Sequence, residues 1–293
     1  MPSSAADGVP CQAIAADREM CQVQMCDTIV VCASVGQMGG IYTSELNRRI
    51  QPEGDDIVNA LLIRIGADSS GGGGSWNGPV DTQSGKFAYV PIPETHPVHA
   101  GMEKPYSALT PVLSTFGLSL PPHLGAQQMH LDPDFELLTY GDQGGRARQM
   151  RAYLHAGDLI VFYAGLFDVC GGARLVYAIV GVFVVEDMIQ AADILANSRD
   201  INAHSRRILR ADATDLIVRA RPGVSGRLER CLPVGEWRDR AYRVRRDVIE
   251  AWGGLSIKDG YLQRSARLPQ FIDPARFQRW LEAKNPVLIQ TNN

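Results

Sequence analysis

Long hydrophobic runs are missing from this sequence, and cysteine is scarce. The longest apolar run, Leu175 to Val185, has 11 residues, whereas a membrane-spanning helix needs about 20. We therefore expect no integral membrane protein. The start of the chain also lacks the basic and apolar segments of a signal peptide. None of the six cysteines forms a Cys-x-x-Cys pair, so we expect free thiols and a cytoplasmic protein.

Lysine is rare as well, because 25 of the 29 basic residues are arginine. The net charge of −3 hides an uneven distribution: residues 1–59 carry −5, residues 60–198 carry −6 and residues 199–280 carry +8. Clustered positive charge is typical of proteins that bind phosphate groups, and arginine matches phosphate with two parallel hydrogen bonds. The basic segment predicts a nucleic-acid or nucleotide partner. A solvated basic face is the alternative.

The chain is expected to hold one folded domain. Residues 1–57 are rich in Ala, Ser, Gln and Asp and lack sustained hydrophobic periodicity, which predicts a poorly ordered N-terminal extension. Apolar residues make up 45% of the chain, enough for a sizeable core. We place the domain at residues 58–284 and a tail at residues 285–293.

Apolar patterning predicts the fold class. Runs of apolar or alternating residues predict strands over 60–65, 86–92, 159–164 and 175–185. Helical patterns cover 186–197, 247–252 and 274–281, and the last has a typical start at Asp273 and Pro274. Predicted strands dominate the middle of the chain, and predicted helices lie towards its ends. This order favours an α+β fold with a curled or barrel-like mixed sheet and peripheral helices.

Several common sites are excluded or weakened. The glycines at 71–74 lack the Gly-Lys-Ser/Thr ending of a P-loop, and Pro79 argues against the helix of a dinucleotide fingerprint. His96 and His99 have metal-like spacing, but Pro97 lies between them and no third ligand is near. His130 lies in a loop segment and adds little. The sequence predicts no metal site, and it assigns neither a cofactor nor an oligomeric state.

The first candidate site is the loop that follows the strand 60–65. Asp68 stands at the carboxyl end of this strand, and the glycine run allows a close backbone approach to a ligand. Trp76 offers a flat face for stacking on a base, and Asn77 offers a donor and an acceptor for a base edge. The alternative is a simple connection with Trp76 folded onto the core.

Two further segments offer groups that suit phosphate. In residues 202–207, His204 can act as a base near neutral pH, and Arg206 or Arg207 can bind a phosphate. In residues 221–230, Ser225, Arg227 and backbone N–H groups suit an anion. A solvated loop and a structural turn are the respective alternatives.

The last candidate segment, residues 252–267, is dense in groups that could contact or react with a nucleotide. Lys258 is a candidate catalytic residue, Tyr261 a candidate base contact, and Arg264 and Arg267 candidate phosphate contacts. Each of them alone suits an ordinary surface position.

Two resemblances add to these patterns. The segment "GDLIVFYA…YAIVGVFVVED" resembles the central hairpin of PUA-like domains, the ASCH, EVE and YTH modules, which are small β-barrels that bind RNA or modified bases. The blocks "IRIGADSSGGGGSWNGPVD", "LTYGD", "NAHSRR", "RPGVSGRLERC" and "WGGLSIKDGYLQRSARLP" together resemble the third nucleotide-modification-associated domain family. That resemblance implies a role in pathways that modify or recognise nucleic-acid bases.

Three hypotheses of function follow. The first is a nucleic-acid-associated protein that recognises or helps to make modified bases. The second is an enzyme acting directly on a nucleotide or nucleic acid, with Asp68 as general base or metal-binding carboxylate and Lys258 or His204 assisting. The third is a small-metabolite-binding protein. Convergence of Asp68, His204 and Lys258 on one cleft would favour an enzyme, and scatter would favour a reader.

Overall fold

The computed structural model describes residues 59–69, 76–262 and 266–293. The expected N-terminal extension at residues 1–57 lies outside them, so the division into extension, domain and tail stays a prediction. No helix in the described part of the chain has the length and apolar character that crossing a membrane would require.

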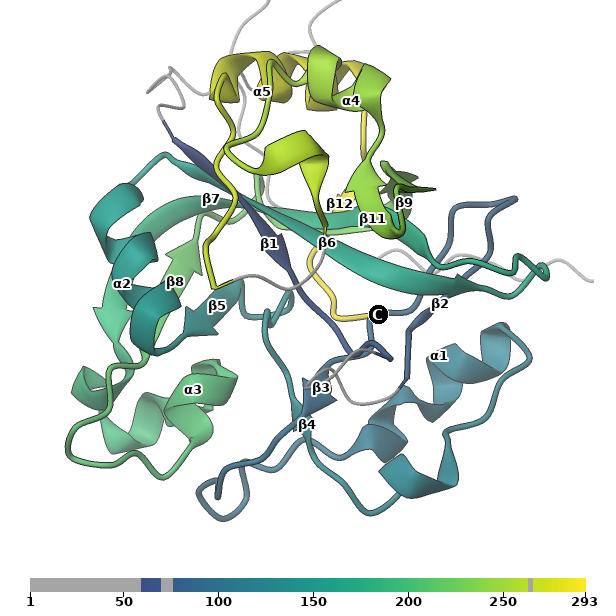
Figure 1. Ribbon diagram of the computed structural model, residues 1–293. Coiled ribbons are helices and arrows are strands. Elements are labelled where there is room, and N and C mark those ends of the chain that lie inside the picture. Colours follow the sequence, from purple (N-terminus) through teal and green to yellow (C-terminus); the bar gives the residue numbers. More distant parts are fainter. Residues whose placement is uncertain (1–58, 70–75, 263–265) are drawn as a thin grey trace, which may run out of the picture. The chain divides into compact units, whose positions relative to one another are not determined.

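A mixed sheet forms the centre of the domain (Figure 1). Strand β6 (Leu159–Asp168) pairs in parallel with β1 (Ala60–Arg64) and in antiparallel fashion with β7 (Val176–Gln190). The long β7 then pairs with two partners along its length, β9 (Gly226–Pro233) through its first half and β8 (Leu216–Ala220) through its second. Pairing of β8 with β5 (Thr139–Asp142) completes this edge.

The remaining elements are short. The strands are β2 (Pro79–Val80), β3 (Ile92–Pro93), β4 (Met129–His130), β10 (Gly235–Arg238), β11 (Ala241–Val244) and β12 (Leu288–Ile289). The α-helices are α1 (Thr110–Thr115), α2 (Gly144–Tyr153), α3 (Ala203–Arg206), α4 (Arg246–Ala251) and α5 (Pro274–Ala283). The 3-10 helices are η1 (Tyr106–Leu109), η2 (Pro122–Leu124), η3 (Ala191–Asp193), η4 (Ala196–Ile201) and η5 (Lys258–Gly260).

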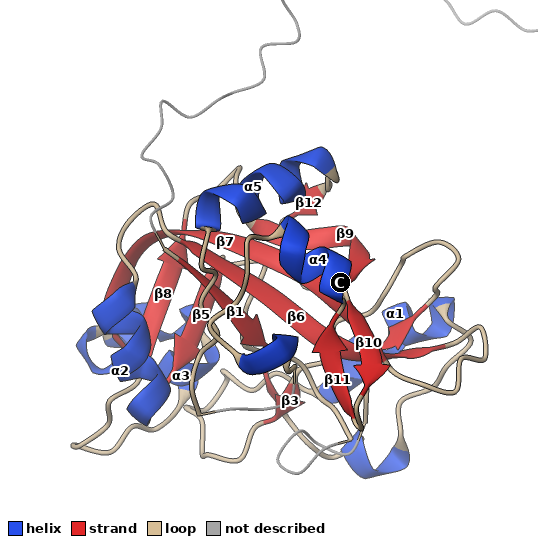
Figure 2. Cartoon of the chain, turned by 45° about the horizontal axis from the view of Figure 1, so that its top comes forward, coloured by secondary structure: helices blue, strands red, loops and turns tan. Residues whose placement is uncertain are grey.

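Both faces of the sheet are buried, because successive side chains of a strand point to opposite faces. In β1, Ala60 and Leu62 pack in the cluster that contains Phe277 of α5, whereas Leu61 and Ile63 pack in the cluster that contains Met150 of α2. Figure 1 shows α4 and α5 over one face, and the β3–β4 pair, α1 and α3 on the other side. The β10–β11 hairpin lies beside α4 (Figure 2).

The structure confirms the α+β class and several predicted elements. The predicted strands at 60–65, 159–164 and 175–185 correspond to β1, β6 and β7. Asp273 caps α5, since its side chain accepts a hydrogen bond from the backbone N–H of Arg276 at 2.9 Å. Among the described strands, the pairings do not close into a barrel, so the barrel-like curling is not confirmed.

Two predicted elements were wrong. The helix expected over residues 186–197 is not present, because β7 continues to Gln190 in register with β8 and only 3-10 turns follow. The alternating segment 86–92 is not a continuous strand; Phe87 makes one bridge with Val80, and only β3 follows. At residues 186–190 the pairing with β8 outweighs the local pattern, whereas the alternating segment 86–92 lacks a continuous strand partner.

Residues 285–293, expected as a tail, contribute to the packing. Strand β12 pairs with β9. The Asn292 side-chain oxygen accepts a hydrogen bond from the Phe135 N–H at 2.7 Å. The side chain of Asn293 accepts a hydrogen bond from the Tyr89 N–H and donates one to the Tyr89 carbonyl.

Candidate functional site

A cavity of about 450 Å³ lies where the ends of β1 and β5 meet β4, α2 and α3. Its described lining includes three arginines, two histidines, two aspartates and a tyrosine. Most of the side chains that line the cavity are therefore polar or ionisable. The volume is in the range of small-molecule sites.

His130, at the end of β4, has one ring nitrogen held by a carboxylate. Its Nδ1 lies 2.6 Å from Oε2 of Glu94, which follows β3. Arg207 donates from Nε to both carboxylate oxygens of Glu94, at 3.0 and 3.1 Å. Burial alone would raise the pKa of Glu94, but the hydrogen bonds from His130 and Arg207 hold it well below its ordinary value. Burial also lowers the pKa of His130 to about 4, which favours the neutral imidazole.

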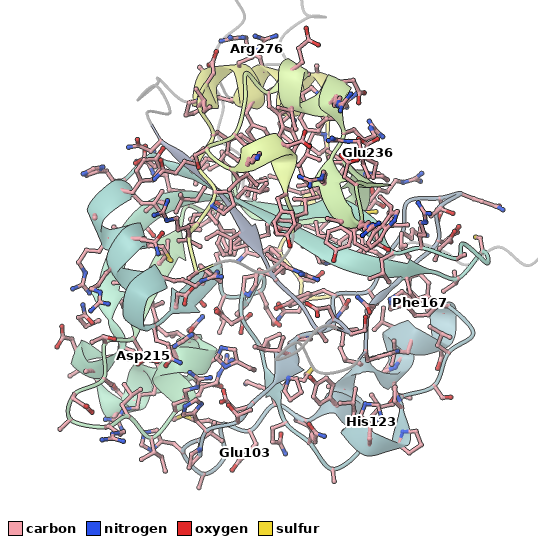
Figure 3. All side chains as sticks on the ribbon, viewed as in Figure 1. Glu103, His123, Phe167, Asp215, Glu236 and Arg276 are labelled. Carbon is pink, nitrogen blue, oxygen red and sulfur yellow. The ribbon has the colours of Figure 1, made fainter. Side chains whose placement is uncertain are left out.

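His204 has the same arrangement on the other side of the site. Its Nδ1 lies 2.5 Å from Oδ1 of Asp215, which is labelled in Figure 3 and immediately precedes β8. Asn202 begins the short helix α3 with a capping box, in which its side-chain oxygen accepts the His204 backbone N–H at 2.8 Å. Burial alone would raise the pKa of Asp215, but the hydrogen bond from His204 lowers it.

Asp132 lies between the two histidines. Its Oδ1 accepts hydrogen bonds from the Gly141 N–H at 2.7 Å and from Nδ2 of Asn202 at 2.8 Å. Its Oδ2 lies 4.0 Å from Nε2 of His130 and 3.8 Å from Nε2 of His204. Burial raises the pKa of this carboxyl group to about 6, against the opposing effect of His204.

These three side chains could hold a metal ion. One ligand atom from each of His130, Asp132 and His204 lies within 4.8 Å of the others. The two imidazole rings meet edge to face, with centroids 4.9 Å apart. The two imidazole rings are tightly packed, because a Cβ added to Gly141 would lie 2.3 Å from Cδ2 of His204.

Arginine side chains surround this cluster. Arg146 of α2 donates from Nε to Asp142 at 2.6 Å and from Nη2 to the Tyr140 hydroxyl at 3.2 Å. The side chains of Arg64 and Arg207 are buried, and Nε of Arg64 and Nη1 of Arg207 have no hydrogen-bond partner within the described residues. Nη1 of Arg207 lies 3.8 Å from Oδ1 of Asp215. Guanidinium groups placed in this way could bind an anion in the cavity.

Comparison with known proteins decides the family. The sequence model of the family described as nucleotide modification associated domain 3 matches residues 59–273. The chain belongs to this family. The match includes every described lining residue of the cavity, from Arg64 to Ala266. No curated protein and no solved structure matches the chain, and the PUA-like resemblance of the central hairpin is not confirmed.

In this member of the nucleotide modification associated domain 3 family, the loop residues predicted from the sequence lie close to β1. Asp68 is buried and forms an ion pair at 3.0 Å with Arg64, which lines the cavity. Trp76 packs, half-buried, on the cluster around Tyr106. Asn77 is buried and donates to the Gly165 carbonyl at 2.7 Å. The proposed base contacts by Trp76 and Asn77 stay predictions.

Of the predicted phosphate contacts, Arg207 lines the cavity, whereas Arg227 and Ser225 are buried elsewhere. The Arg227 guanidinium lies over the Phe87 ring, 5.1 Å from its centroid, and donates to the Thr291 carbonyl. The hydroxyl of Ser225 accepts the Val184 N–H at 2.9 Å. Their binding of phosphate stays untested.

The predicted residues near the C-terminal end do not join His204. Lys258 and Arg267 are exposed, and Tyr261 lies under the Arg243 guanidinium, 5.6 Å from it. Among the described residues that line the cavity, neither Lys258 nor Asp68 appears. Arg264 lies outside the described residues. The structure therefore groups His204 with different partners from those predicted.

Sequence reasoning missed Glu94, His130, Asp132 and Asp215 as site residues. One signal was present, the His130-Leu131-Asp132 spacing. In extended backbone, residues two apart point to the same face, which places an imidazole and a carboxylate together. The partners come from segments more than 30 residues away in the chain, at 94 and at 202–215, and only the fold brings them together.

Proposed function

We propose that the protein is an enzyme that acts on a nucleotide, or on a nucleotide unit of a nucleic acid, bound in the cavity around His130, Asp132 and His204. One observation carries this proposal: His130, Asp132 and His204 form a cluster beside the arginines of the cavity, and a carboxylate holds each imidazole ring. The cluster lies in the part of the chain that matches the nucleotide modification family.

The arginines supply the phosphate-binding half of the site. Arg64 and Arg207 each have one buried nitrogen that lacks a hydrogen-bond partner within the described residues. Arg146 adds a third guanidinium, held in place by Asp142 and Tyr140. Guanidinium groups match phosphate oxygens in geometry and charge, so a phosphate group is the expected anion here.

The histidine and aspartate cluster supplies the argument for catalysis. Burying ionisable groups costs stability, and such clusters with perturbed pKa values concentrate at active sites. Here burial lowers the pKa of His130 to about 4 and raises that of Asp132 to about 6. Asp68 and Lys258 are not among the described residues that line the cavity with His204, so the catalytic set expected from the sequence gives no support to an enzyme. We favour the enzyme over the reader on the different cluster of His130, Asp132 and His204, because recognition of a modified base needs shape and hydrogen bonds but no buried ionisable cluster.

Nucleotide binding tests the location of the site. Calorimetric titration of the full chain with nucleoside 5′-monophosphates, and with the matching nucleosides, should show tighter binding of the phosphorylated forms. Arg146→Gln should weaken that binding about 10- to 100-fold, since hydrogen bonds to charged groups contribute about 1.5–3 kcal/mol. Arg148→Gln is the matched control on the same helix, because Arg148 is exposed and outside the described cavity lining. Equal effects of the two substitutions would contradict the proposal.

Turnover is tested by Asp132→Asn. Mass spectrometry of nucleosides from nucleic acid of cells that express the wild-type chain should show a modified nucleoside, and this product should be lost with Asp132→Asn. Nucleotide affinity in the same variant should stay within a few-fold of wild type. Unchanged nucleoside composition together with selective binding of modified oligonucleotides would favour a reader.

A further inference from the structure

We propose that Nε2 of His130, Nε2 of His204 and Oδ2 of Asp132 are the protein ligands of a divalent first-row transition-metal ion. This inference concerns ion binding and can be tested whether or not the protein acts on nucleotides. It depends on which ring nitrogens are free, which carboxylate oxygen is free, and how far apart these atoms lie.

The tautomers of both histidines follow from their carboxylate partners. Ionised carboxylate oxygens only accept hydrogen bonds, so Nδ1 of His204, 2.5 Å from Asp215, carries the proton. Nδ1 of His130 lies 2.6 Å from Glu94 and 3.1 Å from Nη2 of Arg207, which can only donate; we assign the proton to Nδ1 because the carboxylate contact is the shorter one. Each Nε2 then has its lone pair exposed. A carboxylate on the far nitrogen is the usual partner of a metal-bound histidine, because it fixes the ring and makes it more basic.

Asp132 presents one free oxygen. Two donors, the Gly141 N–H and the Asn202 side chain, occupy Oδ1. Oδ2 faces both histidines at 4.0 and 3.8 Å, which is too long for hydrogen bonds. Around one ion with ligand bonds of about 2.0–2.2 Å, neighbouring ligand atoms lie roughly 3.0–3.5 Å apart. Side-chain movements of under about 1 Å would therefore bring the three atoms onto one ion.

The local charge suits a dication. Glu94, Asp132 and Asp215 carry three negative charges when ionised, and Arg207, which lies against Glu94 and 3.8 Å from Asp215, carries one positive charge. The balance is −2. The nearby Arg146–Asp142 and Arg64–Asp68 ion pairs are internally neutral. Without a cation, the site buries a net negative charge, which is unfavourable in a low-dielectric interior.

The donor set also indicates the class of ion and its accessibility. Two imidazoles and one carboxylate suit zinc, iron and similar ions, whereas magnesium and calcium prefer oxygen ligands alone. Three protein ligands leave further coordination positions open, as in catalytic and not structural sites. Because all three residues line the cavity, the open positions would face a bound substrate.

Metal titration of the full chain tests this proposal. After dialysis against a chelator, calorimetry with Zn²⁺ and visible absorption with Co²⁺ should each give about one ion per chain, and Mg²⁺ should give no measurable binding. His130→Gln, His204→Gln and Asp132→Asn should weaken Zn²⁺ binding more than about a hundredfold, and Asp215→Asn about 10- to 100-fold. His155→Gln should leave it unchanged, since the His155 side chain is 76% exposed and lies outside the cluster.

Folding of each variant is checked by circular dichroism and thermal unfolding. If a histidine variant does not fold, the near-isosteric Asp132→Asn carries the comparison, together with the rise in the Tm of the wild-type chain on adding Zn²⁺. Wild-type protein that binds neither Zn²⁺ nor Co²⁺, or an Asp132→Asn variant that binds them as tightly, would overturn the proposal and leave the cluster as a hydrogen-bonding network alone.

Discussion

Oδ1 of Asp215 lies 2.5 Å from Nδ1 of His204. The same contact recurs between Glu94 and His130, at 2.6 Å. Each histidine is therefore oriented by a carboxylate behind it, and the opposite nitrogens meet at Asp132. Glu94 and Asp215 thereby hold the two rings in fixed orientations and contact neither Nε2 atom in these hydrogen bonds.

The contact between Gly141 and His204 leads to a first prediction. Gly141→Ala would place a Cβ 2.3 Å from His204 and 2.8 Å from Asn202, so His204 must move. We expect a loss of about 1–3 kcal/mol in the free energy of unfolding and a large loss of Zn²⁺ affinity. Gly145→Ala is the control, because it meets nothing within 4 Å and alanine favours the helix α2. Urea unfolding and Zn²⁺ titration of both variants measure this; equal behaviour would count against the packing described.

A second prediction separates a structural role of Asn77 from base reading. Its side chain donates a hydrogen bond to the buried Gly165 carbonyl and accepts one from the Ser69 N–H at 3.1 Å. Asn77→Ala should therefore lower the free energy of unfolding by about 1–3 kcal/mol, whereas the exposed Asn197→Ala should change it little. Selective loss of base discrimination at unchanged stability would support the base-reading role predicted from the sequence instead.

The buried ion pair of Arg206 gives a third prediction. Arg206 lies 2.9 Å from Asp134, and both side chains are 3% exposed. Arg206→Met leaves Asp134 without its guanidinium partner and should cost about 3–5 kcal/mol. The pair between Arg210 and Asp212 is exposed, so Arg210→Met should change stability by less than about 1 kcal/mol. Chemical denaturation measures both, and a small effect of Arg206→Met would mean that the pair is dispensable.

The N-terminal segment gives a fourth prediction. The apolar clusters of the described residues are built from residue 60 onward, and the family match begins at residue 59. A chain that starts at Val58 should keep the thermal transition of the full chain. A markedly lower Tm of the shortened chain would show that residues 1–57 contribute to the core.

Elements with strong local signals could be predicted from the sequence. The apolar runs of β6 and β7 and the Asp273–Pro274 start of α5 depend on neighbouring residues alone. Residues 186–190 were misassigned because their strand conformation depends on pairing with β8, which no local pattern reveals. The strand at residues 288–289 was not predicted for the same reason, since it depends on pairing with β9.

The basic segment at residues 199–280 shows how tertiary pairing changes an electrostatic prediction. Its arginines bind acids from earlier in the chain, as in Arg207 with Glu94, Arg206 with Asp134 and Arg219 with Asp187. The charges of Arg206 and Arg207 are thereby neutralised inside the fold, whereas others of the segment, such as Arg230, Arg246 and Arg276, are exposed. Within the described residues, Arg64 and Arg207 of the cavity and Arg206 and Arg238 outside it each keep one buried nitrogen without a hydrogen-bond partner.

The site itself could be predicted only in part. His204 and Arg207 were identified from one short segment, and both line the cavity. The other members are Glu94 just after β3, His130 at the end of β4, Asp132 just after β4 and Asp215 just before β8, and each of these residues alone looks ordinary. Sequence spacing carries no information about such distant partners, except in the His130-Leu131-Asp132 segment.

Anomalous X-ray scattering at the cobalt edge, from crystals of the full chain grown with Co²⁺ and a nucleoside 5′-monophosphate, tests the site most directly. We predict one strong peak about 2.0–2.2 Å from Nε2 of His130, Nε2 of His204 and Oδ2 of Asp132, with the phosphate in hydrogen-bond contact with the cavity arginines. A nucleotide bound elsewhere, or no peak between these three atoms, would contradict the assignment of this cavity as the active site.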